Sequence, residues 1–159
     1  MKDLITFNKP FVTSLDKDFF SKLNRGLTSL SGDGFYTKKV NKWLKNYSKC
    51  NKALLTHSCT AALEMSGILM NIKPGDEVII PSYTFVSTAN AIVLRGGIPR
   101  FVDIREDTLN IDENYIENAI NKKTKAIIPV HYAGVSAEMD TIKKIAKDNR
   151  LFVAEDAAQ

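Results

Sequence analysis

The sequence contains little histidine and cysteine and no long apolar run, and these scarcities exclude several kinds of site. Its 159 residues include two histidines and two cysteines, and Cys50 and Cys59 are not spaced as a C-x-x-C pair. A structural zinc site is therefore not expected, and the scarcity of cysteine is typical of a reducing compartment. The sequence has no run of about 20 apolar residues and no signal-peptide pattern at its start. We expect a cytoplasmic protein with no membrane association and no metal.

Nucleotide-binding signatures are also missing. The sequence has neither a P-loop nor a Gly-x-Gly-x-x-Gly motif, and its net charge of +4 is modest. A nucleic-acid binder normally has a concentrated basic face, so we do not expect nucleic acid as a partner. One lysine stripe does follow a helical period, and it is either a solvated helix face or a means of attracting an anionic substrate. It consists of Lys38, Lys42, Lys45, Lys49 and Lys52.

The order of apolar runs and turns predicts an α/β protein. Residues 1–51 form an N-terminal helical segment, in which Ser14 caps a helix over 15–26 that Gly26 ends and the lysine-striped helix runs to about Ser48. From residue 52 to 159, strands alternate with helices, which favours a mostly parallel sheet with helices on both faces. The expected strands are 53–56, 78–80, 99–102, 126–130 and 151–154. The expected helices are 60–72, 87–94, 112–120 (capped by Asp112) and 137–149.

Ligands of such sheets bind beyond the carboxyl ends of the strands, so the segments that follow the strands are the candidate sites. The first is 56–63, where Ser58, Thr60 and Ala61 lie at the expected start of a helix. Free backbone N–H groups and the helix dipole make this a possible phosphate cradle. The alternative is that Ser58 or Thr60 only caps the helix.

Aromatic residues and a histidine follow two further strands. Tyr83 or Phe85 can stack on a planar ring, or both are core or subunit-contact residues. His131 follows the fourth strand, where a lone histidine is more often a hydrogen-bonded structural residue than a catalytic one.

A carboxylate ends the last expected strand, where Asp156 is followed by Gln159. Asp156 can cap a helix, bind a metal or pair with a cation, and Asp103 is the only clear second candidate for a metal. A phosphate cradle, an aromatic plane and one carboxylate match pyridoxal phosphate, which has a phosphate, a flat ring and a ring nitrogen that must stay protonated.

Five ordered segments resemble the DegT/DnrJ/EryC1/StrS family of sugar aminotransferases. The resemblance runs from about Phe7 to Gln159. The segments are Thr60–Leu63, Pro74–Val78, Pro81–Asn90, Pro129–Gly134 and Glu155–Gln159.

The resemblance implies a fold-type I transferase that uses pyridoxal 5'-phosphate and works as a homodimer, with this chain as the first part of its large domain. Thr60 and Ala61 match the family's phosphate-binding turn, and Phe85 matches the aromatic residue that stacks on the pyridine ring. Asp156 matches the acid that pairs with the pyridine nitrogen, and it is the catalytic residue implied within this chain. Gln159 matches the side chain near the cofactor's phenolic oxygen.

The same resemblance implies an activity. A dTDP-4-keto-6-deoxy sugar receives an amino group from L-glutamate, in the biosynthesis of a cell-surface polysaccharide such as enterobacterial common antigen or the O-antigen of lipopolysaccharide. The family's Schiff-base lysine follows the segment matched by Glu155–Gln159, so the resemblance implies a truncated chain that is inactive alone. Three alternatives stay open: a dehydratase that uses pyridoxamine phosphate, a non-catalytic binding or dimerisation remnant, and a sugar-nucleotide-binding domain without the cofactor.

Overall fold

The computed structural model describes residues 13–24 and 32–159. The chain forms two compact units, Met1–Leu55 and Thr56–Gln159. The division that the sequence predicts, between residues 51 and 52, stays a prediction.

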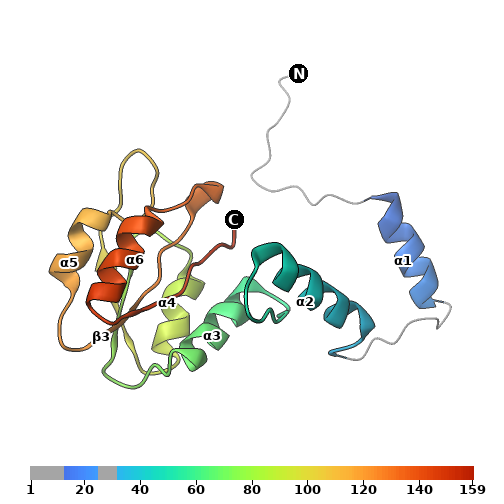
Figure 1. Ribbon diagram of the computed structural model, residues 1–159, viewed down its shortest axis with the longest axis horizontal. Coiled ribbons are helices and arrows are strands. Elements are labelled where there is room, and N and C mark those ends of the chain that lie inside the picture. The colour runs from blue at the N-terminus through green and yellow to red at the C-terminus, as the bar shows by residue number, and fades with distance from the viewer. Residues whose placement is uncertain (1–12, 25–31) are drawn as a thin grey trace. The chain divides into compact units, whose positions relative to one another are not determined.

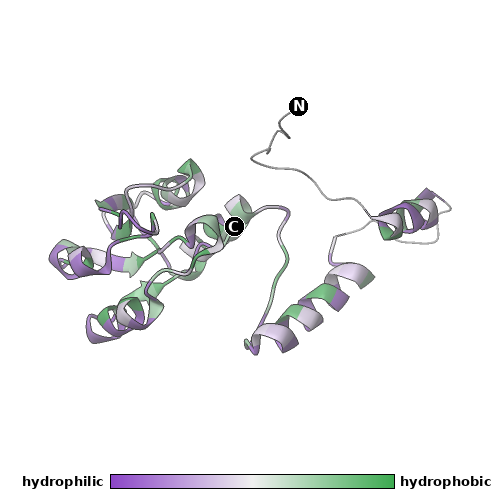
Figure 2. Cartoon of the chain, turned by 90° about the horizontal axis from the view of Figure 1, so that it is seen from above, coloured by the Kyte–Doolittle hydropathy of each residue, from purple (hydrophilic) through white to green (hydrophobic). Residues whose placement is uncertain are grey.

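The first unit contains two helices, α1 (Ser14–Asn24) and α2 (Phe35–Ser48). The prediction that Ser14 caps this helix is wrong, because Ser14 is the first residue of α1. Thr13 precedes it, and the N–H and Oγ1 of Thr13 both donate to Oδ2 of Asp16, at 2.6 and 2.9 Å. These bonds lower the pKa of the Asp16 carboxyl. The predicted helix end at Gly26 lies outside the described residues. Neither helix has a buried residue, and hydrophobic and hydrophilic residues are interleaved along both (Figure 2).

The second unit is a parallel four-stranded sheet with helices between its strands, in the order β2-β1-β3-β4. The predicted α/β class with a parallel sheet is therefore confirmed. Within the described ranges, no helix has the length and apolar character needed to cross a bilayer. The elements are α3 (Cys59–Leu69), β1 (Glu77–Pro81), α4 (Val86–Val93), β2 (Ile98–Val102), η1 (Glu113–Tyr115), α5 (Ile116–Ala119), β3 (Thr124–Ile127), η2 (Tyr132–Gly134), α6 (Met139–Asp148) and β4 (Phe152–Val153).

The sheet separates two apolar cores because successive strand residues point to opposite faces. On β1, Val78 and Ile80 pack with residues of α3 and α4, whereas Ile79 packs on the other face with residues of α5 and α6. Figure 1 shows these two helix pairs on either side of the sheet. The prediction of helices on both faces is confirmed.

Some predicted elements are wrong or displaced. Residues 53–56 form no strand, because the described residues offer them no partner for backbone hydrogen bonds. The strand predicted over 126–130 is β3, which ends at Ile127, and Val130 forms only an isolated parallel bridge with Asp156. The cap at Asp112 is confirmed, since its side chain accepts from the N–H of Asn114 at 3.0 Å, but the helix begins with a 3₁₀ turn.

Strand β2 forms one border of this sheet. The N–H of Ile98 donates to the carbonyl of Asp76 and the carbonyl of Val102 accepts from Ser82, both at 2.8 Å. Residues 98, 100 and 102 therefore direct their backbone groups toward β1, and Pro99 and Phe101 direct theirs away from it. Pro99 lies where its missing N–H removes no bond of the ladder.

Candidate functional site

The site lies where the parallel strands end. Beyond β4, the N–H of Asp156 donates to the carbonyl of Pro129 at 2.9 Å, and the N–H of His131 donates to the carbonyl of Asp156 at 3.0 Å. These two bonds extend the pairing of β3 and β4 past the regular strands. They hold the Asp156 side chain in the interior, where it is 4% exposed.

Three donors surround the Asp156 carboxylate. Oγ1 of Thr88 donates to Oδ2 at 2.7 Å, the N–H of Ala158 donates to Oδ1 at 3.3 Å, and Sγ of Cys59 lies 3.7 Å from Oδ1. No lysine, arginine or histidine within 13–24 and 32–159 forms an ion pair with Asp156. Hydrogen-bond donors compensate part of the cost of burying this carboxylate, but its negative charge has no cation beside it among the described residues, so the site can accept a cationic group.

The thiol of Cys59 acts as a donor in this cluster. Burial raises its pKa, and the neighbouring carboxylate of Asp156 raises it further. Cys59 therefore stays protonated at neutral pH and does not have the lowered pKa of a nucleophilic cysteine.

The start of α3 contributes hydroxyl groups. Oγ of Ser58 accepts from the N–H of Ala61 at 3.2 Å, which makes Ser58 the N-cap. Oγ1 of Thr60 lies 2.8 Å from Oγ of Ser87, a residue in the first turn of α4. The capping alternative therefore holds for Ser58, while Thr60 and Ser87 form an exposed hydroxyl pair between the starts of two helices.

The aromatic residues take different positions. Phe85 is the N-cap of α4 and is 74% exposed, so it is not a core residue. Tyr83 instead pairs with Tyr132, with hydroxyl oxygens 3.1 Å apart and ring centroids 5.1 Å apart. This hydrogen bond raises the pKa of Tyr132. Of these two residues, Phe85 therefore has the ring that can face a planar ligand, and its role as a subunit-contact residue stays a prediction.

His131 has a structural role in this arrangement. Its Nδ1 accepts from the N–H of Ala137 at 3.1 Å, so the neutral ring carries its proton on Nε2, which lies 3.0 Å from Oε2 of Glu155. Both ring nitrogens are therefore used within the protein.

The loop after His131 is held from two sides. Oδ1 of Asn110 accepts from the N–H of Tyr132 at 2.8 Å, and its Nδ2 donates to the carbonyl of Val135 at 3.0 Å. On the other side, Oε1 of Gln159 accepts from the N–H of Ala133. The Gln159 amide is thus oriented against this loop, and its NH₂ group is left to donate to a ligand.

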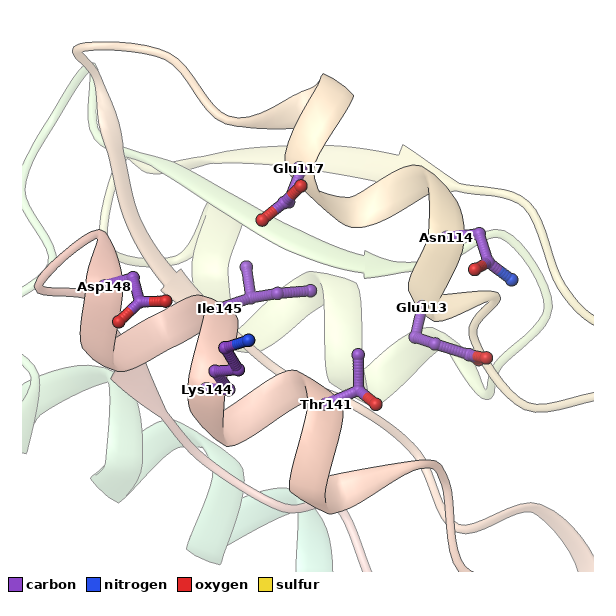
Figure 3. Close-up of a pocket in the computed structure, with 7 residues that line it drawn as sticks. All are labelled: Glu113, Asn114, Glu117, Thr141, Lys144, Ile145 and Asp148. Atoms are coloured by element: carbon purple, nitrogen blue, oxygen red, sulfur yellow. The ribbon is translucent and has the colours of Figure 1, made fainter.

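The structure places two cavities away from this rim. One of about 240 Å³ lies between η1, α5 and α6 (Figure 3). The other, of about 520 Å³, runs along β2 and includes Asp103 in its lining. Asp103 does not join Asp156 but accepts from the N–H of Ile104 at 2.8 Å. Over the part of the chain that the structure describes, no three His, Cys, Asp or Glu side chains are grouped to hold a metal.

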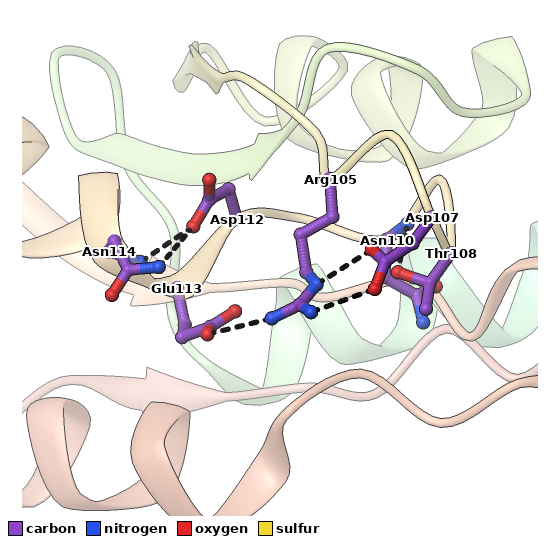
Figure 4. Close-up of polar contacts among 7 residues, drawn as sticks. All are labelled: Arg105, Asp107, Thr108, Asn110, Asp112, Glu113 and Asn114. Carbon is purple, nitrogen blue, oxygen red and sulfur yellow. Dashed lines mark hydrogen bonds and ion pairs between the residues drawn. The ribbon is translucent and has the colours of Figure 1, made fainter.

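An ion cluster beside the first cavity stabilises the turn between β2 and η1 (Figure 4). Arg105 donates from Nη1 to Glu113 at 3.1 Å and from Nε and Nη2 to the two carboxylate oxygens of Asp107 at 3.0 and 2.9 Å. The cluster raises the pKa of Arg105 and lowers that of Asp107. Arg105 contacts both carboxylate oxygens of Asp107 and Oε1 of Glu113, whereas Oε2 of Glu113 is buried without a hydrogen-bond partner among the described residues.

Thr84, Thr88 and Cys59 lie within the candidate segments that the sequence indicated, but the sequence assigned no role to any of them. Thr88 is fully buried and contacts Asp156, and Oγ1 of Thr84 lies 2.8 Å from Oγ1 of Thr88. Thr84 precedes the N-cap of α4 and Thr88 lies within the helix, so no helical spacing in the sequence indicated the contact of Thr88 with Asp156.

Comparisons with known proteins agree with this architecture. The model of the DegT/DnrJ/EryC1/StrS aminotransferase family matches residues 13–159. An uncharacterized protein of Methanocaldococcus jannaschii is 45% identical over 157 residues, which are 96% of this chain and 40% of that protein. The spore coat polysaccharide biosynthesis protein SpsC of Bacillus subtilis is 46% identical over 123 residues, 76% of this chain and 32% of that protein. This chain thus spans two fifths or less of the length of these relatives.

Solved structures show the same fold. The NtdA protein of Bacillus subtilis, solved with bound cofactor PMP, has a TM-score of 0.84 and 34% identity, covering 100% of this chain and 38% of that one. The S. venezuelae DesV protein, in complex with a ketimine intermediate, has a TM-score of 0.82 and 32% identity over 91% of this chain and 39% of that one. The sheet of this chain therefore matches part of the fold-type I architecture. This chain belongs to the DegT/DnrJ/EryC1/StrS aminotransferase family.

Proposed function

We propose that this chain carries part of the cofactor site of a pyridoxal-phosphate-dependent sugar-nucleotide aminotransferase. The observation that supports it is the Asp156 carboxylate, which is 4% exposed, has three donors around it and has no ion-pair partner among the described residues. A protonated pyridine nitrogen is a cation that such a carboxylate can pair with.

The neighbouring residues fit the remaining parts of the cofactor. The hydroxyls of Thr60 and Ser87 lie 2.8 Å apart at the starts of α3 and α4, where partial positive charge favours a phosphate ester. The exposed ring of Phe85 offers a planar face, and the NH₂ group of Gln159 offers a donor for the phenolic oxygen. When bound, pyridoxal phosphate supplies an electron sink that stabilises negative charge on a carbon bearing nitrogen. The role of Asp156 is to keep the ring nitrogen protonated.

For the whole protein we propose transfer of the amino group of L-glutamate to a dTDP-4-keto-6-deoxy sugar, by a cytoplasmic homodimer. The resemblance of the five sequence segments to dTDP-4-amino-4,6-dideoxygalactose transaminase of enterobacterial common antigen synthesis supports this choice of substrate. A role in polysaccharide synthesis also has support from the 46% identity to SpsC, a spore coat polysaccharide biosynthesis protein.

The test uses pyridoxamine phosphate, because its amine cannot form imines with surface lysines. Binding to the chain is followed by the fluorescence of the ligand, in the wild type and in Asp156→Ala. Since hydrogen bonds and ion pairs that involve a charged group contribute about 1.5–3 kcal/mol, we expect binding to weaken roughly 10- to 100-fold. The matched control is Asp148→Ala, an exposed carboxylate at the end of α6, which should leave binding unchanged. No saturable binding by the wild type, or equal binding by Asp156→Ala, would overturn the proposal.

A further inference from the structure

The Asp156 carboxylate is anchored by a chain of two threonine hydroxyls. Oγ1 of Thr88 donates to Oδ2 of Asp156 at 2.7 Å, and Oγ1 of Thr84 lies 2.8 Å from Oγ1 of Thr88. A hydroxyl has one proton, and an ionised carboxylate only accepts. Because the Thr88 proton points to Asp156, the proton of the second bond must come from Thr84. The direction of the chain is therefore Thr84 to Thr88 to Asp156.

The positions of the two threonines in the fold determine this chain of hydrogen bonds. Thr84 precedes the N-cap of α4, and Thr88 lies one turn further in the same helix, where its N–H donates to the carbonyl of Phe85 at 3.1 Å. Thr88 has 0% exposure, so no water replaces its hydroxyl. Helix α4 thereby fixes one oxygen of a carboxylate that belongs to the end of β4, 68 residues later in the chain.

The other oxygen has weaker partners. Oδ1 lies 3.3 Å from the backbone nitrogen of Ala158 and 3.7 Å from Sγ of Cys59. Among the described residues, the thiol of Cys59 is the titratable group that contacts this carboxylate. The short bond from Thr88 is thus the contact that sets the orientation of the carboxylate.

We infer that Thr88, itself oriented by Thr84, is a positioning residue that holds the Asp156 carboxylate in the orientation needed to pair with a cationic ligand. This inference rests on the proposed function where the ligand is the cofactor ring, but the hydrogen-bond chain can be tested without any ligand. Thr88→Val removes the hydroxyl and keeps the shape of the side chain, whereas Thr88→Ser keeps the hydroxyl. Thr84→Val removes only the outer link.

The first readout needs no cofactor. In chain labelled with ¹³C at the aspartate carboxyl groups, the Asp156 signal is identified by its loss in Asp156→Asn. We expect this signal to move in Thr88→Val, to move less in Thr84→Val, and to return to the wild-type position in Thr88→Ser. Circular dichroism establishes that each variant is folded. An unmoved signal in folded Thr88→Val, or an equal displacement in Thr88→Ser, would overturn the inference.

The second readout uses pyridoxamine phosphate labelled with ¹⁵N in the ring. We expect Thr88→Val to bind about tenfold more weakly, which corresponds to about 1.4 kcal/mol, and its bound ring signal to move toward that of the neutral ring. Thr88→Ser should bind within about twofold of the wild type. If the wild type binds no pyridoxamine phosphate, the proposed function fails, and the carboxyl signals still decide the inference on Thr88. If Asp156→Ala abolishes binding but Thr88→Val matches the wild type in both readouts, the proposed function stands and the positioning role fails.

Discussion

Replacing Asn110 by alanine tests how the loop at the site rim is held. Asn110 is 2% exposed, and its side chain makes two hydrogen bonds, to the N–H of Tyr132 at 2.8 Å and to the carbonyl of Val135 at 3.0 Å. Each bond contributes about 1 kcal/mol, and a buried group left without a partner costs about 1–3 kcal/mol. Water can enter the space left by the side chain and satisfy part of this requirement. We therefore expect the free energy of unfolding to fall by about 2–4 kcal/mol.

The measurement is urea denaturation followed by circular dichroism, with hydrogen exchange of the Tyr132 amide as a local probe. Asn114→Ala is the matched control, because Asn114 is exposed and, among the described residues, its side chain bonds to Asp112 alone, so a loss of at most about 0.5 kcal/mol is expected. Exchange at Tyr132 should accelerate in Asn110→Ala and not in the control. If Asn110→Ala loses no more stability than Asn114→Ala, the side chain does not hold the loop and the reasoning is refuted.

Two further outcomes follow from the site and from the packing of the sheet. Because burial and the Asp156 carboxylate both raise the pKa of Cys59, its alkylation by iodoacetamide should have a pH midpoint above 9.0, and Asp156→Asn should lower that midpoint; an unchanged midpoint would contradict the contact. A Cβ atom on Gly97 would lie 2.8 Å from the Cγ2 atoms of two isoleucines, so Gly97→Ala should cost about 1–3 kcal/mol in urea denaturation. Gly32→Ala, where no atom lies within 4 Å of the added carbon, is its control and should not be destabilising; equal losses in the two variants would exclude overpacking as the cause.

The architecture could be predicted because apolar runs of strand length alternate with helical periods over most of the second unit. Where prediction failed, the cause was tertiary. Residues 53–56 have the composition of a strand, but a strand exists only with a partner, which the sequence pattern does not reveal. At α1, Thr13 and Ser14 are both good caps by residue type, and their sequence does not show that Ser14 is already the first residue of the helix.

For the candidate site, the sequence indicated the position of Asp156 but not the contacts around it. The position of Asp156 after a strand followed from the pattern, and the structure buries its carboxylate; the expectation that this strand is itself buried was wrong, since Phe152 is exposed and Val153 half-buried. The bond from Thr88 joins residues 68 positions apart, so no local pattern could indicate it. His131 illustrates the same limit, since the contacts of its two ring nitrogens with Ala137 and Glu155 depend on the loop conformation.

The proline in β2 makes the two borders of the described sheet chemically unequal. Of the two residues that direct their backbone away from β1, Pro99 has no N–H, so this border offers one amide donor, that of Phe101. An incoming strand would lose a hydrogen bond there and would also meet the fixed pyrrolidine ring. Phe152–Val153, at the opposite border, contains no proline, and because the N–H of Ala154 donates to Ile127 of β3, the N–H of Val153 is directed outward. Any additional strand, from this polypeptide or from another molecule, is therefore accepted more readily beside β4, and β2 is protected from edge-to-edge aggregation.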